Sequence, residues 1–225
     1  MYSLWQICYT GSVNFLFRLS KPLLFSMDPE RAHYLALDSL RLAFRFGMSG
    51  CARVGNPVQF CGIEFPNMIG LAAGFDKNAD YIDALGSLGF GHVEVGTVTP
   101  RPQPGNDRPR LFRLPAHGAI INRMGFNNKG VDYLVTNMSK SKFTGVRGIN
   151  IGKNFDTALE DAHKDYLTCF QKVYDYADYI VVNVSSPNTE GLRSLQGASE
   201  LTQILEPLLN DREQKTRAGS LRKPL

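Results

Sequence analysis

Residues 179–189 read YIVVNVSSPNT, and this stretch carries the clearest architectural signal in the chain. Its first four residues, Tyr179 to Val182, are apolar and mostly β-branched, which predicts a buried strand. Two asparagines, two serines, a threonine and a proline follow within the next seven positions. A buried strand that ends in so many hydrogen-bonding side chains typically opens onto a ligand site, although a polar turn after a strand would give the same pattern.

The same alternation of strand and helix recurs on both sides of this stretch. Short apolar runs predict strands, and the longer runs between them predict helices. The expected strands are Met68–Ala73, His92–Thr97, Gly148–Ile151 and Tyr179–Val184, and the expected helices are Asn78–Leu88, Lys129–Lys140, Thr157–Tyr176 and Ala198–Asn210. This order predicts an α/β fold with a parallel sheet and right-handed crossovers.

Polar residues follow the end of each expected strand. They lie in residues 74–77, at Thr97, at Asn150 with residues 152–154, and in residues 183–189. The carboxyl ends of parallel strands meet at one edge of a sheet, where α/β enzymes and barrels in particular carry their active sites. The spacing therefore predicts one functional site built from four strand ends.

The N-terminal part of the chain has a different pattern. Asp28 and Pro29 are a typical helix start, and the helix is expected to run to Phe46. A shorter helix is expected over residues 19–25. The apolar surface of the longer helix is broad, so this surface packs against the main domain, lines a groove for a lipid-like ligand or meets a membrane.

Glycine and proline in residues 47–57 predict a linker after these helices. We therefore expect a helical subdomain in residues 1–50 and an α/β domain in residues 51–225. Residues 1–17 carry no charged side chain, and Arg18 follows them directly. This stretch is too short and too polar for a membrane-spanning helix. Residues 1–17 are interpreted either as an interfacial segment that lies on a membrane, or as a frayed terminus or a misassigned start codon.

The composition argues against several classes of function. With 43% hydrophobic and 20% charged residues, the 225-residue chain is ordinary for a globular protein. Its net charge of +4 is small and its basic residues are scattered along the chain, which predicts no nucleic-acid partner. The four cysteines form no CxxC pair and have no ligand spacing, so reduced thiols and no metal are expected. The common phosphate-binding motifs and the GxSxG of serine hydrolases are missing from the sequence.

Several longer blocks carry a family resemblance. They are LAAGFDKNADYIDALGSLGFGHVEVGTVTPRPQPGNDRPRLFRL from residue 71, INRMGFNNKGVD from residue 121, GINIGKN from residue 148 and NVSSPNTEGLRSLQ from residue 183. Together they resemble the dihydroorotate dehydrogenases, FMN-dependent (β/α)8 TIM barrels that oxidise dihydroorotate to orotate in pyrimidine (UMP) synthesis. DPERAH in residues 28–33, and serine rather than cysteine at position 186, resemble the membrane-associated, quinone-reducing class.

The resemblance implies that Ser186 is the catalytic base. It would take a proton from C5 of dihydroorotate while a hydride leaves C6 for the flavin. A serine hydroxyl is a poor base at neutral pH, so a relay must carry the proton onward. The resemblance places Thr189, a water and the region of Phe126 in this relay, and Ser185 is expected to be structural.

The resemblance also implies the binding residues. Asparagine amides suit the amide-like edges of orotate, and a lysine can neutralise its carboxylate. The flavin residues are Ala73, Gly74, Phe75, Asp76, Lys77, Thr97, Asn150 and Asn183. The substrate residues are Lys77, Asn122, Arg123, Met124, Gly125, Phe126, Asn183 and Asn188. The quinone residues are His33 and Arg113, although each of these two, taken alone, would more often be structural.

A membrane quinone as acceptor implies peripheral association with a membrane. This is the inner face of the cytoplasmic membrane in a bacterium, or the mitochondrial inner membrane in a eukaryote. A complete barrel needs about 250 residues, so we expect only about the first four β/α units and a fragment that binds FMN poorly. Two alternatives stay open: a flavin barrel that acts on a related pyrimidine with a soluble acceptor, and a non-catalytic remnant.

Overall fold

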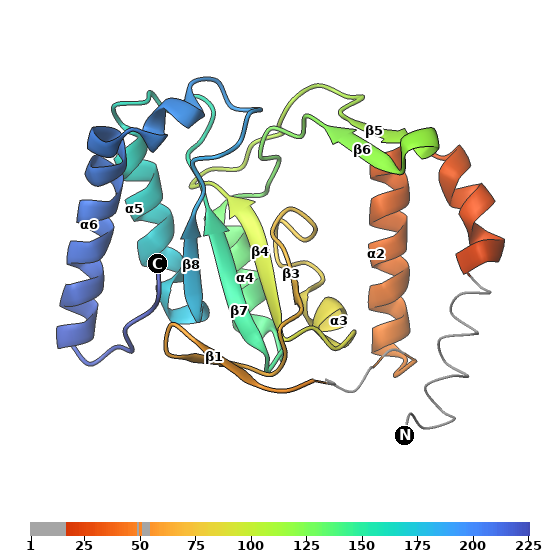
Figure 1. Cartoon of the computed structure of the whole chain (residues 1–225), viewed down its shortest axis with the longest axis horizontal. Helices are drawn as coiled ribbons and strands as arrows, with labels where there is room; N and C mark the ends of the chain where they lie inside the picture. The colour runs from red at the N-terminus through yellow and green to blue at the C-terminus, as the bar shows by residue number, and fades with distance from the viewer. Residues whose placement is uncertain (1–16, 49, 51–54) are drawn as a thin grey trace.

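A four-stranded parallel sheet forms the centre of the protein (Figure 1). The computed structural model describes residues 17–48, 50 and 55–225. The strand order is β3-β4-β7-β8, and these strands span Gly70–Leu71, His92–Val98, Val146–Ile151 and Tyr179–Val182. All three pairings are parallel, so the four carboxyl ends lie at the same edge.

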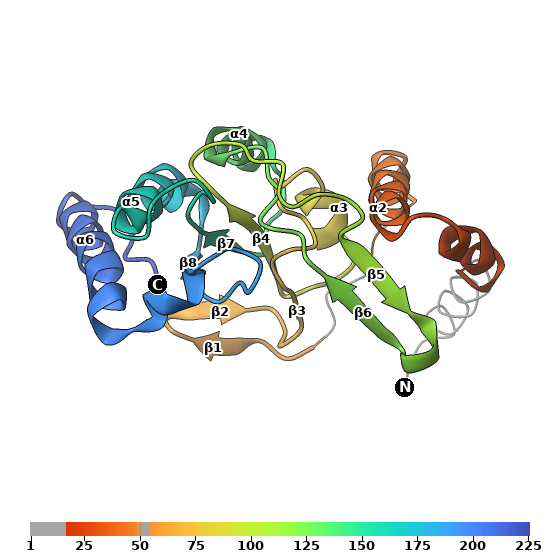
Figure 2. The same ribbon diagram turned by 90° about the horizontal axis from the view of Figure 1, so that it is seen from above.

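A helix follows each strand, and these four helices cover one face of the sheet while the opposite face is left to the hairpins (Figure 2). They are α3 (Ile82–Gly86), α4 (Val131–Lys140), α5 (Ala162–Val173) and α6 (Ala198–Arg217). Alternate strand residues point toward the helices, and Val93, Val95, Ile149 and Ile151 are fully buried in the core there. The predicted α/β class with four β/α units of a TIM barrel is confirmed.

Two helices precede the sheet, as predicted. Residues 17–26 are helical, and α2 spans Pro29–Arg45. The carboxylate of Asp28 caps α2 by accepting a hydrogen bond from the backbone N–H of Arg31 at 3.0 Å. Pro29 stands in the first turn, where its missing N–H costs nothing. A search of the described helices finds none long and apolar enough to cross a membrane.

The broad apolar surface of α2 is divided between two environments. Leu37 is buried against Tyr81 and Leu85 of the main domain, whereas Leu42 and Phe46 are exposed. The expected packing against the main domain is thus confirmed for one side of α2. The expected segment 1–17 lies almost wholly outside the described residues, and so does part of the expected linker. The boundary at residue 50 therefore stays a prediction.

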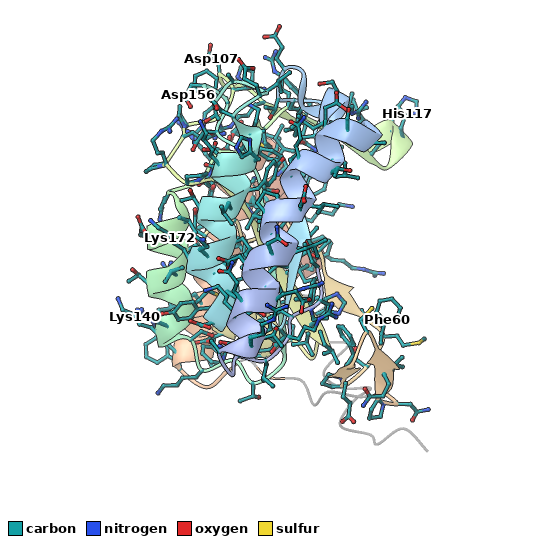
Figure 3. All side chains as sticks on the ribbon, turned by 90° about the vertical axis from the view of Figure 1, so that its left-hand side faces the viewer. Phe60, Asp107, His117, Lys140, Asp156 and Lys172 are labelled. Carbon is teal, nitrogen blue, oxygen red and sulfur yellow. The ribbon has the colours of Figure 1, made fainter. Side chains whose placement is uncertain are left out.

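A hairpin follows residues 47–57 and closes the amino end of the sheet. It pairs β1 (Val58–Phe60) with β2 (Ile63–Phe65). The ring of Phe65 packs edge-on against that of His92, with centroids 5.4 Å apart. Figure 3 shows Phe60 at this end and Asp107 and Asp156 at the opposite end.

A second hairpin lies beside the carboxyl ends of the strands and was not predicted. It pairs β5 (Leu111–Leu114) with β6 (Ala119–Asn122), joined by the short 3-10 helix η1 (Pro115–His117). The hairpin extends from the sheet toward α2 (Figures 1 and 2). It therefore forms one wall of the space above the strand ends.

Several helix boundaries differ from the prediction. Helix α3 spans Ile82–Gly86 rather than Asn78–Leu88, and α4 begins at Val131 rather than Lys129. α5 begins at Ala162 rather than Thr157, because the carboxylate of Asp165 accepts hydrogen bonds from the Asn154 backbone at 2.8 Å and the Thr157 hydroxyl at 2.7 Å. These bonds hold residues 154–157 in a turn. Helix α6 is longer than predicted, because it continues through Pro207 and ends at Arg217 rather than Asn210. The chain then returns to the sheet, where the carbonyl of Pro224 accepts a hydrogen bond from the Ile180 N–H at 3.0 Å.

Candidate functional site

A cavity of about 820 Å³ lies at the carboxyl ends of the strands, between the sheet, β6 and α2. This volume falls in the range of about 300–1,000 Å³ that is typical of small-molecule sites. Most of the predicted site residues line it: His33, Ala73, Gly74, Phe75, Asp76, Lys77, Thr97, Asn122, Met124, Gly125, Phe126, Asn150, Asn183, Ser186 and Asn188. Arg113, Arg123 and Thr189 do not. The fold thus brings four strand ends and β6 to one cavity.

Three of the predicted polar residues form a continuous hydrogen-bond chain across the strand ends. The amide nitrogen of Asn183, after β8, donates to the hydroxyl of Thr97 on β4 at 2.9 Å. That hydroxyl donates in turn to the amide oxygen of Asn150 on β7 at 2.6 Å. The chain continues to Glu94, a β4 residue that sequence reasoning missed. Three neighbouring strands are therefore locked together at the floor of the cavity.

The two serines after β8 have different surroundings. Ser185 is held by Asn183, whose amide oxygen accepts hydrogen bonds from both the N–H and the hydroxyl of Ser185 at 3.0 Å. Ser186 lines the cavity, and its hydroxyl accepts a hydrogen bond from the Asn188 N–H at 3.2 Å. Thr189 is buried beneath this loop. The geometry agrees with Ser185 as a structural residue and places Ser186 at the cavity.

The loop after β3 is organised by its own aspartate. Asp76 is buried, and its carboxylate accepts hydrogen bonds from the backbone N–H groups of Asn78, Asp80 and Tyr81. Burial raises the pKa of Asp76 to about 6, against the lowering effect of these N–H groups. The side chain expected at the flavin therefore shapes the loop. Gly74 has φ of 100° and no heavy atom near the position of a Cβ, so its backbone offers an open surface to a flat ring.

Lys77 is the predicted cation of the cavity. Burial lowers its pKa to about 8, and the nearby charge of Arg110 acts in the same direction. An ammonium with little solvation of its own gains most from an anionic ligand, because a carboxylate replaces the lost water. Lys77 is therefore suited to bind a carboxylate, and it is partly neutral above pH 8.

Backbone carbonyls of residues 124–126 accept hydrogen bonds from the proline-rich segment 100–109 and from Asn128. The side chain of Gln103 donates to the Gly125 carbonyl at 3.1 Å, and that of Asn128 donates to the Phe126 carbonyl at 2.7 Å. Both φ angles of Gly125 and Phe126 are positive, at 70° and 53°. The proline-rich segment therefore supports residues that are predicted to contact the substrate.

Arg123 does not face the cavity. Its guanidinium donates to the Pro109 carbonyl at 2.9 Å and lies 5.8 Å from the ring centroid of Phe112. Of the residues Arg123 to Phe126 that are expected along the substrate, Met124, Gly125 and Phe126 line the cavity and Arg123 does not. Arg123 directly follows Asn122, the last residue of β6, and successive side chains of an extended segment point to opposite sides. Asn122 therefore lines the cavity while Arg123 packs within the hairpin.

The two predicted quinone residues occupy different surroundings. His33 of α2 lines the cavity, and its Nε2 donates to the Phe75 carbonyl at 3.0 Å. Burial lowers the pKa of His33, so the ring is neutral at pH 7. Arg113 of β5 lies 4.8 Å over the ring of Phe25 and donates to the Met27 carbonyl at 3.0 Å. Arg113 thus joins the second hairpin to the first helix.

A buried ion pair in the cavity wall was not foreseen. Glu30 of α2 accepts two hydrogen bonds from Arg110, at 2.7 and 3.0 Å. Neither residue stood out in the sequence, because partners 80 positions apart leave no local pattern. Among the described residues, no group of three or more His, Cys, Asp or Glu side chains could hold a metal ion.

Comparison with known proteins agrees with this arrangement. Residues 57–218 match the family model described as dihydroorotate dehydrogenase. Two relatives named dihydroorotate dehydrogenase (quinone) are each 60% identical: that of Acinetobacter baylyi over 86% of this chain and 58% of its own length, and that of Ralstonia nicotianae over 87% and 59%.

Solved structures are similar as well. The crystal structure of DHODH in complex with ferulenol from Eimeria tenella has a TM-score of 0.76 and 37% identity, covering 88% of this chain and 58% of its own. The ligand-free DHODH of the same organism has a TM-score of 0.72 and 41% identity over 80% of this chain. The chain spans 58–59% of the length of the two curated relatives above.

Proposed function

The chain belongs to the dihydroorotate dehydrogenase family, and we propose that it supplies the dihydroorotate-oxidising site of an FMN enzyme that passes electrons to a membrane quinone. One observation carries the proposal. Ser186, Lys77 and the amides of Asn122, Asn183 and Asn188 all line a single cavity at the strand ends. A base, a cation and several amides are what removal of a proton next to an amide-rich, anionic ring requires.

The residues of this cavity fit a flavin. The floor offers the open backbone of Gly74 and the hydroxyl and amide groups of Thr97, Asn150 and Asn183. FMN, when bound, would accept the hydride from the substrate. Barrels of this type commonly bind phosphate groups after strands seven and eight, so the four β/α units described here would hold the ring more than the phosphate.

Ser186 is the proposed acceptor of the substrate proton. The Asn188 N–H that donates to its oxygen favours charge on that oxygen as the proton leaves. Lys77 binds the substrate carboxylate, and the loop from Met124 to Phe126 is held in place to border the ring. Thr189 and Phe126 remain the proposed exit for the proton.

Quinone access and membrane contact are proposed for the N-terminal helices. His33 borders the cavity from α2, and Arg113 contacts the helix of residues 17–26. The exposed apolar side chains of these helices are Phe17, Leu19, Leu23, Phe25, Leu35, Leu42, Phe44 and Phe46. Such a surface suits peripheral association with a membrane, on the inner face of the cytoplasmic membrane if the source is bacterial.

The test compares Ser186→Ala with Ser185→Ala in the full chain. FMN binding is measured by quenching of flavin fluorescence, and turnover by bleaching of flavin absorbance on addition of dihydroorotate. We expect both variants to bind FMN and only Ser186→Ala to lose bleaching, by about a hundredfold or more. Equal bleaching by the two variants would contradict the role of Ser186.

Two further outcomes decide the rest of the proposal. A folded wild-type chain that does not bind FMN would show that the chain is not a catalyst on its own. Reoxidation by fumarate but not by a short-chain ubiquinone would contradict the quinone as acceptor. Circular dichroism of each variant provides the control for folding.

A further inference from the structure

Glu94 lies in a row of three residues that cross the sheet beneath the cavity. In the parallel register, Glu94 of β4 is opposite Gly148 of β7, which is opposite Tyr179 of β8. Gly148 has no side chain, and a Cβ there would come within 2.3 Å of the Tyr179 ring. The ring therefore lies over Gly148, and its hydroxyl donates to Oε2 of Glu94 at 3.1 Å.

The other carboxylate oxygen of Glu94 holds Asn150. The amide nitrogen of Asn150 donates to Oε1 of Glu94 at 2.9 Å. A carboxylate only accepts hydrogen bonds, so it selects the amide orientation in which nitrogen faces Glu94 and oxygen faces Thr97. Burial, and secondly the charge of Glu94, raises the pKa of Tyr179, which keeps its hydroxyl protonated as a donor.

In this chain of hydrogen bonds every donor points the same way, from Ser185 toward Glu94. It begins at the Ser185 N–H, passes through Asn183, Thr97 and Asn150, and ends on Glu94. The side-chain amides of Asn150 and Asn183 each donate one of their two N–H groups within this chain of hydrogen bonds, and the second N–H group is not used in it. Because Asn150 and Asn183 both line the cavity, their second N–H groups are available to a ligand there.

We propose that Glu94 is a positioning residue that orients the amide of Asn150, so that Asn150 presents an N–H donor to the ligand. The ligand is then a ring whose edge carries acceptors, such as ring carbonyl oxygens or unprotonated ring nitrogens. This inference rests on the proposed function for the identity of the ring, but its structural part does not.

An exchange of groups between the two positions tests the structural part. Asn150→Asp sets two carboxylates at the 2.9 Å contact, and we expect the folding equilibrium constant at pH 7 to fall about a hundredfold, with recovery toward pH 5 as the pair shares a proton. Glu94→Gln/Asn150→Asp restores a satisfied chain, since Gln can donate to the new carboxylate and accept from Tyr179. We expect this double variant to regain at least tenfold of the loss.

Both measurements use urea unfolding of the full chain and need no flavin. If Asn150→Asp is as stable as the wild type at pH 7, or if the double variant is no more stable than Asn150→Asp, the role of Glu94 is overturned. These outcomes hold even if the wild-type chain fails to bind FMN, which would count against the proposed function alone.

The ligand part is tested by FMN binding, with fluorescence quenching as the readout. Glu94→Gln can still accept from Asn150, so we expect affinity within about threefold of the wild type. The double variant is folded but has no N–H at position 150, so we expect binding about tenfold weaker, the usual order for one lost hydrogen bond. Equal affinity of the double variant and Glu94→Gln would overturn the claim that Asn150 presents a donor.

Discussion

The ion pair between Glu30 and Arg110 joins α2 to the main domain from inside the protein. Both side chains are only 5% exposed, and the guanidinium meets both carboxylate oxygens. Arg108 adds a third contact at 3.1 Å from the solvent side. In Glu30→Ala, the charge of Arg110 would stay buried with only the carbonyls of Pro104 and Asn106 as acceptors.

The expected cost follows from this geometry. Removing one partner of a buried pair costs about 3–5 kcal/mol, because the remaining charge is uncompensated. Because Arg110 keeps two carbonyl acceptors, we expect a cost at the lower end of this range, about 3 kcal/mol. The hydrogen bond from Arg110 holds the pKa of Glu30 below its usual 4.5. The stabilisation is therefore complete above that value and is lost as the pH falls through the lowered pKa of the folded state.

Urea unfolding at pH 7, followed by circular dichroism, measures the loss. Asp132→Ala is the matched control, because it breaks the Lys172–Asp132 pair, which is 2.6 Å long but 41% and 78% exposed. Such a surface pair is worth about 1 kcal/mol or less. Hydrogen exchange of the α2 amides shows whether this helix detaches before the sheet unfolds. If Glu30→Ala costs no more than Asp132→Ala, and α2 exchange is unchanged, the reasoning is refuted.

Three more changes give measurable outcomes. Gln103→Leu removes the donor to the Gly125 carbonyl and the acceptor of the Asn154 amide and the Phe155 N–H. Urea unfolding should show a loss of about 1–3 kcal/mol for each group left unpaired, and an unchanged midpoint would contradict this support. Lys77 should titrate by NMR near pH 8, with stability rising as the pH passes from the folded value toward the ordinary 10.5, and with carboxylate ligands binding more weakly over the same interval; a midpoint near 10.5 would contradict the burial. Gly148→Ala brings a methyl group within 2.3 Å of the Tyr179 ring, and thermal unfolding should show a large loss that Tyr179→Ala relieves.

Local sequence patterns were sufficient for much of the fold. Asp28 and Pro29 marked the start of α2 because a capping carboxylate and a proline act within a single turn. The strand at residues 179–182 was visible because buried parallel strands are continuous apolar runs. Family resemblance then separated Ser186 from Ser185, and the hydrogen bonds of Ser185 to Asn183 agree with that distinction.

Other features had no local signal. The hairpin of β5 and β6 was not predicted, and its turn at Gly118 has φ of 57° in a segment without an alternating pattern. Gln103 was not among the predicted site residues, since its contact with Gly125 spans 22 positions. The start of α5 depended on the contact of Asp165 with the backbone of residue 154. Each of these depends on partners that are distant in the sequence.

The amino-acid sequence by itself determined the order of strands and helices, the position of polar residues after each strand, and the family to which these residues point. Periodicity and capping act over a few residues, so they are legible in one dimension. Only the tertiary structure decided which polar groups meet. Glu94 ends the hydrogen-bond chain that runs through Asn150, because β4 pairs with β7 in parallel register. Glu30 is the partner of Arg110 because α2 packs beside the strand ends. Register and packing join residues far apart along the chain, and they determine where charges and hydrogen-bond donors face the cavity.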